Sequence, residues 1–159
     1  MTSAPFSVKF QPMKNAGYTR QERSFIALMR VLAIIFFGGA ILFAAMPDYL
    51  PAYLTKVGNG LFGWESAPFP PAGEMFWVVQ AVAFLLVLSY LCVVVQRNIV
   101  RNIGYTRPVI LAALVSFAGF SACFFFCERH FVYFVAAVVD GAVGIITWRF
   151  YHRAHKSRA

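Results

Sequence analysis

The sequence predicts an all-α protein, an antiparallel four-helix transmembrane bundle with a short interfacial helix in its first connecting loop. Three observations lead to this fold class: a strongly apolar composition, four apolar stretches of membrane-spanning length, and basic residues clustered beside those stretches. Of the 159 residues, 60% are apolar and 13% are charged, and the mean hydropathy is +0.68. A soluble domain has about 45–50% apolar and about 25% charged residues, so the composition indicates a membrane protein.

The four apolar stretches define the predicted spans. A helix rises about 1.5 Å per residue, so about 20 apolar residues cross the hydrocarbon core of a bilayer. Backbone polar groups in lipid must be satisfied within the segment, which favours helices. The predicted spans cover residues 24–46, 75–96, 108–127 and 130–150.

These spans form a single predicted transmembrane domain, residues 24–150. The polar segment 1–23 precedes it as a tail, and a basic tail, 151–159, follows it. The first apolar run is too long and too far from the start for a secretory signal, so we read it as a retained anchor. The only long connection is the loop 47–74.

Lysine and arginine fall mostly on one side of the predicted bundle. Twelve of the fourteen lie in the two tails, beside them, or in the loop between the second and third spans, and only Lys56 and Arg129 lie on the other side. Cytoplasmic loops carry an excess of Lys and Arg. We therefore expect both termini in the cytoplasm, and we expect the inner membrane of a bacterium as the location.

The loop 47–74 begins with apolar residues at helical spacing, which predicts a short helix in the outer interface. Asp48 is the predicted N-cap, and Gly58 with Gly60 is predicted to end the helix. A lid over a ligand pocket is the functional interpretation of this loop. Its many aromatic residues favour the structural one, an anchor at the membrane surface.

Asp140, in the fourth predicted span, is the first candidate functional residue. An acid near the middle of a span costs several kcal/mol on insertion scales, so it should face the bundle and have a partner. Arg30 in the first span lies at a depth that differs by roughly 6 Å, which predicts an intramembrane pair between the two. A proton or ion site on Asp140 is the functional alternative, and exposure of Asp140 to a partner subunit is a third.

Two other kinds of polar side chain lie within the spans. Gln80 is a candidate for an interhelical hydrogen bond. Cys123 and Cys127 are four residues apart on one predicted helix, where their side chains point in parallel directions and suit a disulfide poorly. Cys92 lies near the opposite end of another span. Small residues on packing faces are therefore a better account of the cysteines than redox chemistry, and they show no metal-binding spacing.

The sequence predicts no cofactor and no metal site. Only His130 is near a position where a histidine could face a pigment within the membrane, and no histidine at matching depth accompanies it. A quinone or a pigment remains an open alternative, while bound lipids are expected.

The net charge of +8 favours anionic lipid headgroups over nucleic acid as partners, because the basic residues cluster at the ends of apolar segments. The predicted headgroup-binding residues lie in the loop after the second span and in the C-terminal tail. They are Arg97, Arg101, Arg107, Arg153, Lys156 and Arg158.

The stretch ALMRVLAIIFFGG, which contains Arg30, is followed by LFGW before the second span, with a Pro/Gly-rich stretch between. This arrangement resembles the first half of small four-helix membrane proteins of the DoxX type, and it covers about the first third of the chain. The resemblance implies a redox-associated or accessory role.

The function that the sequence favours is that of a non-catalytic integral membrane protein, an accessory or structural subunit that packs laterally in a larger membrane complex. Tight Gly and Ala faces suit such lateral association. One alternative is a small homo-oligomeric transporter or channel that uses Asp140. The other is a DoxX-like redox-associated membrane protein.

Overall fold

The computed structural model describes residues 17–63, 75–126 and 129–156, and nearly all of them are helical. The helices are α1 (Arg20–Ala45), α2 (Tyr49–Phe62), α3 (Met75–Arg97), α4 (Ile99–Asn102), α5 (Thr106–Phe126) and α6 (Phe131–Lys156), with a 3-10 turn, η1 (Ile103–Tyr105), between α4 and α5. No strand occurs in these three ranges. The predicted all-α class is confirmed.

Four apolar helical segments are long enough to cross a membrane: Arg20–Ala45, Val78–Arg97, Ile99–Phe126 and Phe131–Lys156. They match the four predicted spans in number and order, and they make the chain an integral membrane protein. Most of their residues are not buried inside the molecule. Apolar side chains that stay outside the protein core are expected where the surrounding solvent is lipid.

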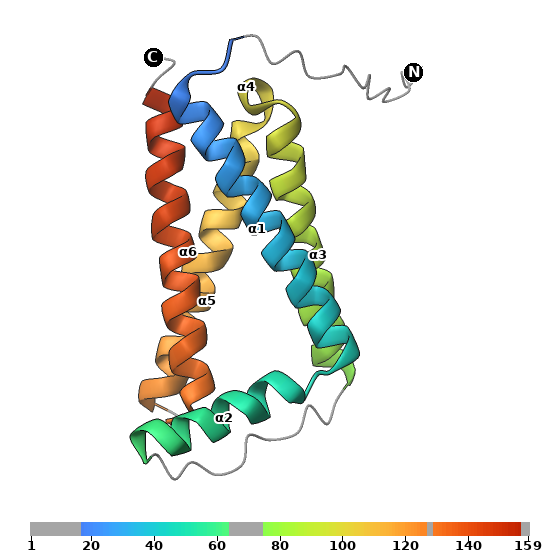
Figure 1. Cartoon of the computed structure of the whole chain (residues 1–159), viewed down its shortest axis with the longest axis vertical. Coiled ribbons are helices and arrows are strands. Elements are labelled where there is room, and N and C mark those ends of the chain that lie inside the picture. The colour runs from blue at the N-terminus through green and yellow to red at the C-terminus, as the bar shows by residue number, and fades with distance from the viewer. Residues whose placement is uncertain (1–16, 64–74, 127–128, 157–159) are drawn as a thin grey trace, which may run out of the picture.

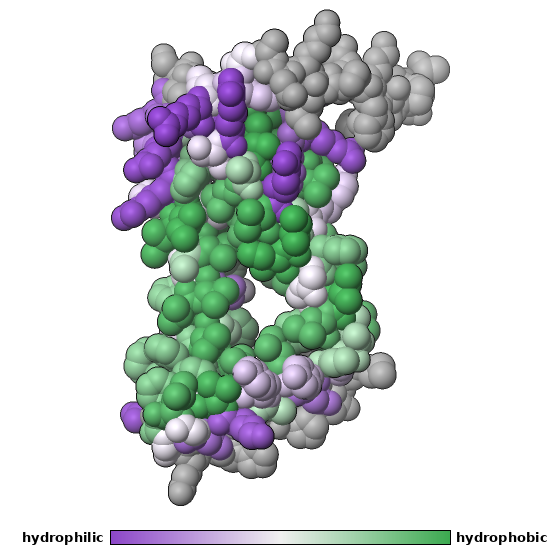
Figure 2. Space-filling model, viewed as in Figure 1, coloured by the Kyte–Doolittle hydropathy of each residue, from purple (hydrophilic) through white to green (hydrophobic). Residues whose placement is uncertain are grey.

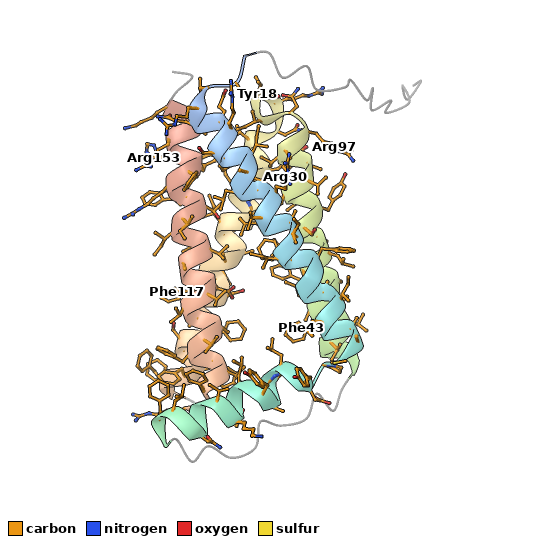
Figure 3. All side chains as sticks on the ribbon, in the orientation of Figure 1. Tyr18, Arg30, Phe43, Arg97, Phe117 and Arg153 are labelled. Carbon is orange, nitrogen blue, oxygen red and sulfur yellow. The ribbon has the colours of Figure 1, made fainter. Side chains whose placement is uncertain are left out.

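The four long helices run up and down the molecule, and α2 crosses it at one end (Figure 1). Arg20 at the start of α1 and Lys156 at the end of α6 lie together at the other end. Hydrophilic side chains gather over that end of the molecule, and a broad apolar region follows (Figure 2). We call it the basic end, because Arg97 and Arg153 lie there (Figure 3), and we call the opposite end the α2 end.

The helices are arranged as two pairs. Helix α1 packs chiefly on α3, and α5 packs chiefly on α6, while contacts between the pairs are few. In the first pair the Ser89 hydroxyl donates a buried hydrogen bond to the carbonyl oxygen of Ala33 at 2.9 Å. In the second pair a Cβ on Gly141 would lie 2.9 Å from Cδ2 of Phe117, so the Phe117 ring packs directly against this glycine.

The two pairs meet at the basic end, where the hydrophobic core lies. Its fully buried members include Phe25 and Met29 of α1, Cys92 and Val95 of α3, and Val109 of α5. The remaining members of this core cluster are Leu32, Ala33, Phe36, Leu88, Ile99 and Ala154. Toward the α2 end the pairs diverge (Figure 1), and α2 spans the distance between them.

Helix α2 is held against α6 by a close crossing. A Cβ on Gly58 would meet Cβ of Phe131 well inside van der Waals contact, and the rings of Phe62 and Phe131 are 5.5 Å apart. Within the described residues, α2 makes its main contacts outside its own helix with α6. The crossing thus connects the loop after α1 to the last helix of the chain.

The ends of two helices differ from the predicted ones. Helix α1 begins at Arg20, four residues earlier than the predicted span, because Thr19 and Glu22 form a capping box: the Thr19 amide donates to Oε2 of Glu22 at 2.8 Å, and the Glu22 amide donates to Oγ1 of Thr19 at 3.3 Å. Helix α2 does not end at Gly58 or Gly60. It ends at Phe62, where Gly63 takes a left-handed conformation (φ 60°).

The predicted N-cap of α2 is confirmed in position, but its side chain does not cap the helix. Asp48 occupies the N-cap position, yet its side chain makes no capping hydrogen bond, because its backbone is already helical (φ −90°, ψ −14°). A side-chain cap requires the extended conformation that Thr19 adopts at the start of α1. The position of α2 in a membrane interface stays a prediction.

Candidate functional site

The two helix pairs leave an opening between them on the basic-end side of α2. Figure 2 shows this opening as a gap in the molecule, bordered mainly by apolar side chains. Helix α2 crosses it at the α2 end, and the core cluster closes it at the basic end. Phe43 of α1 lies on one side of this region and Phe117 of α5 on the other (Figure 3). The opening therefore faces the side of the molecule, in a direction parallel to the membrane plane.

Asp140 is on the side of α6 that faces the other helix pair. It precedes Val143, Thr147 and Ala154 by three, seven and fourteen residues, a spacing that places all four on one face of the helix. Ala154 belongs to the core cluster, Val143 packs against it, and Thr147 is fully buried. Closer to the α2 end, where the pairs have separated, the same face carries Asp140, which is half-buried.

The close packing of α5 on α6 fixes the position of Asp140. Gly141, next to it, lies against Phe117, and a Cβ on Gly144 would be 3.0 Å from Cδ2 of Leu114. Ala137 is also buried. These small residues keep α5 close on one flank of Asp140, while the face of α6 that carries Asp140 is directed toward the other helix pair. Asp140 makes no hydrogen bond or ion pair with any residue in the described ranges.

The structure does not bring Arg30 and Asp140 together. The helices extend beyond the predicted spans, so Arg30 lies roughly 15 Å from the start of α1 and Asp140 roughly 24 Å from the end of α6. Arg30 is also exposed, outside the buried face of α1 that carries Met29 and Ala33. Figure 3 shows Arg30 on the part of α1 nearer the basic end, at some distance from Phe117. The two depths differ by roughly 9 Å, close to the roughly 6 Å expected from the sequence, so the exposed direction of Arg30 is what separates the two residues.

The predicted headgroup residues lie around the basic end. Arg97 and Arg153 are on opposite sides of the molecule in Figure 3, and Arg101, Arg107 and Lys156 are exposed near them. Arg107 Nε donates to the Tyr151 hydroxyl at 3.1 Å, which joins α5 to α6. Arg158 lies outside the described residues. The basic side chains surround this end of the molecule, and their binding of lipid headgroups stays a prediction.

The other polar candidates lie apart from the opening or within the core. Gln80 is exposed on α3 and makes no hydrogen bond with a described residue, so the predicted interhelical bond does not form there. Cys92 is a buried core residue, and Cys123 is half-buried with a free thiol. Cys127 lies outside the described residues. His130 is 1% exposed beside Tyr133, with ring centroids 5.6 Å apart.

Thr147 is a candidate that sequence reasoning missed. Its hydroxyl oxygen is buried without a hydrogen-bond partner among the described residues, and it lies between Asp140 and Tyr151 on one face of α6. The spacing in the sequence could have indicated it. Thr147 follows Asp140 by seven residues and Tyr151 follows Asp140 by eleven, which places all three on one face of a helix. No group of three metal-ligating side chains gathers in the part of the chain that the structure describes.

Comparisons with protein-family models, with curated proteins and with solved structures find no match for this chain. The resemblance to DoxX-type proteins stays a prediction. The geometry of the site is therefore the basis for the function proposed below.

Proposed function

We propose that this integral membrane protein is a non-catalytic accessory subunit, which packs laterally in a larger membrane complex. The observation that carries the proposal is Asp140, a half-buried carboxylate within a membrane-spanning helix, with no partner in the described part of the chain. An acid in this position costs several kcal/mol unless another group pairs with it. A second protein is a natural source of that group.

The exposed faces of the spans fit this role. Large apolar side chains such as Ile34, Leu111 and Val138 are more than half exposed along the membrane-spanning helices. Lipid contacts such faces in an isolated protein, and other helices contact them in a complex. The distribution of basic residues supports an arrangement in a bacterial inner membrane with the basic end in the cytoplasm and α2 at the outer interface.

The test is purification of the tagged full-length protein from its native membranes in a mild detergent, followed by a native gel and mass spectrometry. We expect a large complex in which this chain has a fixed stoichiometry. Deleting the chain should then lower the amount of assembled complex without changing the activity of each complex that remains. A chain that migrates alone, or as a small homo-oligomer, would contradict the proposal.

A second candidate is a proton or cation transporter that uses Asp140. The inward face of α6 favours it, because Asp140, Thr147 and Tyr151 follow one another toward the basic end, where Arg107 binds Tyr151. The packed core at that end opposes it, since Thr147 is fully buried among apolar residues. Uptake into proteoliposomes that stops in Asp140→Asn, while the protein still assembles, would establish transport in place of the accessory role.

A further inference from the structure

We propose that the opening beside Asp140 is a docking site for one transmembrane helix of a partner protein, and that this helix carries a lysine or arginine at the depth of Asp140. The inference rests on the proposed accessory function and names the site and the chemistry of the partner. Phe43 of α1 borders the site in Figure 3, and Asp140 lies on the face of α6 that is directed toward the other helix pair.

The charge of Asp140 needs a partner at its own depth in the membrane. Asp140 lies roughly 13 Å from the start of α6 and roughly 24 Å from its end, well within a membrane-spanning helix. Ionisable groups at this depth pair with one another or line a polar cavity. The one basic residue deep in a described span, Arg30, is on another side of α1 and nearer the basic end. No basic side chain in the described ranges complements Asp140, and a partner protein can supply that charge.

The helices around the opening determine from which direction a partner can reach Asp140. The core cluster fills the basic end, where Phe25, Met29 and Val109 are fully buried. At the other end α2 crosses between the pairs, held by Gly58 against Phe131. Both approaches along the membrane normal are thus covered by the protein, and the open approach is lateral (Figure 2). Acyl chains and transmembrane helices are what this approach meets.

A transmembrane helix fits this opening better than acyl chains do. Acyl chains carry no hydrogen-bond donor, and the charged part of a phospholipid lies at the membrane surface, far from the depth of Asp140. A helix with a basic side chain supplies both an apolar surface for the walls and a charge-assisted hydrogen bond for the carboxylate. Among the described residues, a second copy of this chain offers Arg30 and Arg149 within its spans, and both lie at other depths than Asp140, because copies arranged in one membrane keep their depths.

The experiment places a photo-crosslinking phenylalanine analogue at Phe43 in the full-length protein in native membranes. The matched control is the same analogue at Phe37, which is on the same helix, 52% exposed, and points about 120° away around it. We expect Phe43 to cross-link to one transmembrane segment with a Lys or Arg near its centre, and Phe37 not to cross-link to that segment. Peptide mapping by mass spectrometry identifies the segment.

The charge is tested by two substitutions in the same assay. Asp140→Asn should lower cross-linking from position 43 about ten-fold, since it removes a charge-assisted hydrogen bond. Asp140→Glu keeps the charge and should retain most of it. Asp140→Lys combined with an acid in place of the partner's basic residue should restore the cross-link. This rescue would also exclude misfolding as the cause of the loss.

The outcomes separate this inference from the accessory function. If the protein purifies in a stoichiometric complex but position 43 cross-links only to lipid, to a second copy, or to a segment without a basic residue, the docking inference is wrong and the accessory role stands. If no complex is found, both are wrong. An unchanged cross-link in Asp140→Asn would also overturn the inference, because the carboxylate would then have no part in docking.

Discussion

The two ends of this molecule differ in how its helices are held together. At the basic end, side chains from four long helices interlock, and Phe25, Cys92 and Val109 are fully buried in one cluster. At the α2 end, the two helix pairs are separated from each other, and a single crossing of α2 over α6 connects the last helix to the loop after α1. The difference suggests that the basic end gives the chain its fold, while the α2 end is arranged for contact with something else.

The largest effect should come from the core at the basic end. Phe→Ala in a soluble core costs about 3–5 kcal/mol, and we expect about 2 kcal/mol for Phe25→Ala, because lipid also solvates the ring in the unfolded state. Unfolding in mixed detergent micelles, followed by circular dichroism, measures the loss. Phe37→Ala is the control, and it should change stability by less than about 0.5 kcal/mol. Equal losses at both positions would mean that the core is not concentrated where the structure places it.

A smaller effect should come from the crossing at the α2 end. Gly58→Ala places a methyl group against Phe131. Overpacking of this kind costs about 1–3 kcal/mol, and we expect about 1.5 kcal/mol here, because α2 makes its main contacts with α6 alone and can shift away from it. Gly60, two residues later, has no neighbouring atom within 4 Å, so Gly60→Ala should be neutral or slightly stabilising.

The buried thiol of Cys92 reports whether the two ends respond separately. Its labelling rate, measured on its own peptide by mass spectrometry, should rise in Phe25→Ala and stay unchanged in Gly58→Ala. Faster labelling in both variants would show that the ends unfold as one unit.

Between the two ends, Gly141→Ala should cost about 1 kcal/mol, because Phe117 is 42% exposed and has room to turn away from the added methyl group. Gly119→Ala on α5, with no neighbouring atom within 4 Å, is the matched control. The comparison uses the same micelle unfolding assay. If Gly141→Ala were as harmless as the control, the α5–α6 contact would be looser than its geometry indicates.

The smallest effect should come from Ser89→Ala, which removes the hydrogen bond to Ala33 within the first helix pair. Interhelical hydrogen bonds in membrane proteins contribute about 0.6 kcal/mol on average. Ser24→Ala removes a bond within α1 only, to the carbonyl oxygen of Arg20, and should change the contact between α1 and α3 less. A difference that exceeds about 2 kcal/mol would show that this bond, and not apolar packing, holds the pair.

The sequence was sufficient for the parts of the fold that depend on the membrane. The number and order of the spans followed from the length of apolar runs. The start of α1 was also readable, since Thr19 and Glu22 have the spacing of a capping box, although the prediction took the first apolar residues as the start. Local composition is a good guide wherever the bilayer or a cap decides the outcome.

The candidate site was harder to predict, because it depends on the angles between helices. Asp140 was identified from its chemistry, and its inward face followed from the small residues around it. The partner of Asp140 was not identified correctly. Pairing with Arg30 required a depth and a side-chain direction that only the packed helices determine. Gly58 is a similar case: a glycine read as a helix stop is needed for the approach of Phe131, 73 positions away in the chain.

That contact also constrains the order of events during synthesis. Chains grow at about 5–20 residues per second, so residue 131 is made roughly 4 to 15 seconds after Gly58. Helix α1 can associate with α3 during this interval, whereas α2 has no docking surface until α6 has been translated and inserted. The nascent protein therefore lacks the α2–α6 crossing until its last helix arrives, and a chaperone or insertase has access to α2 throughout that time.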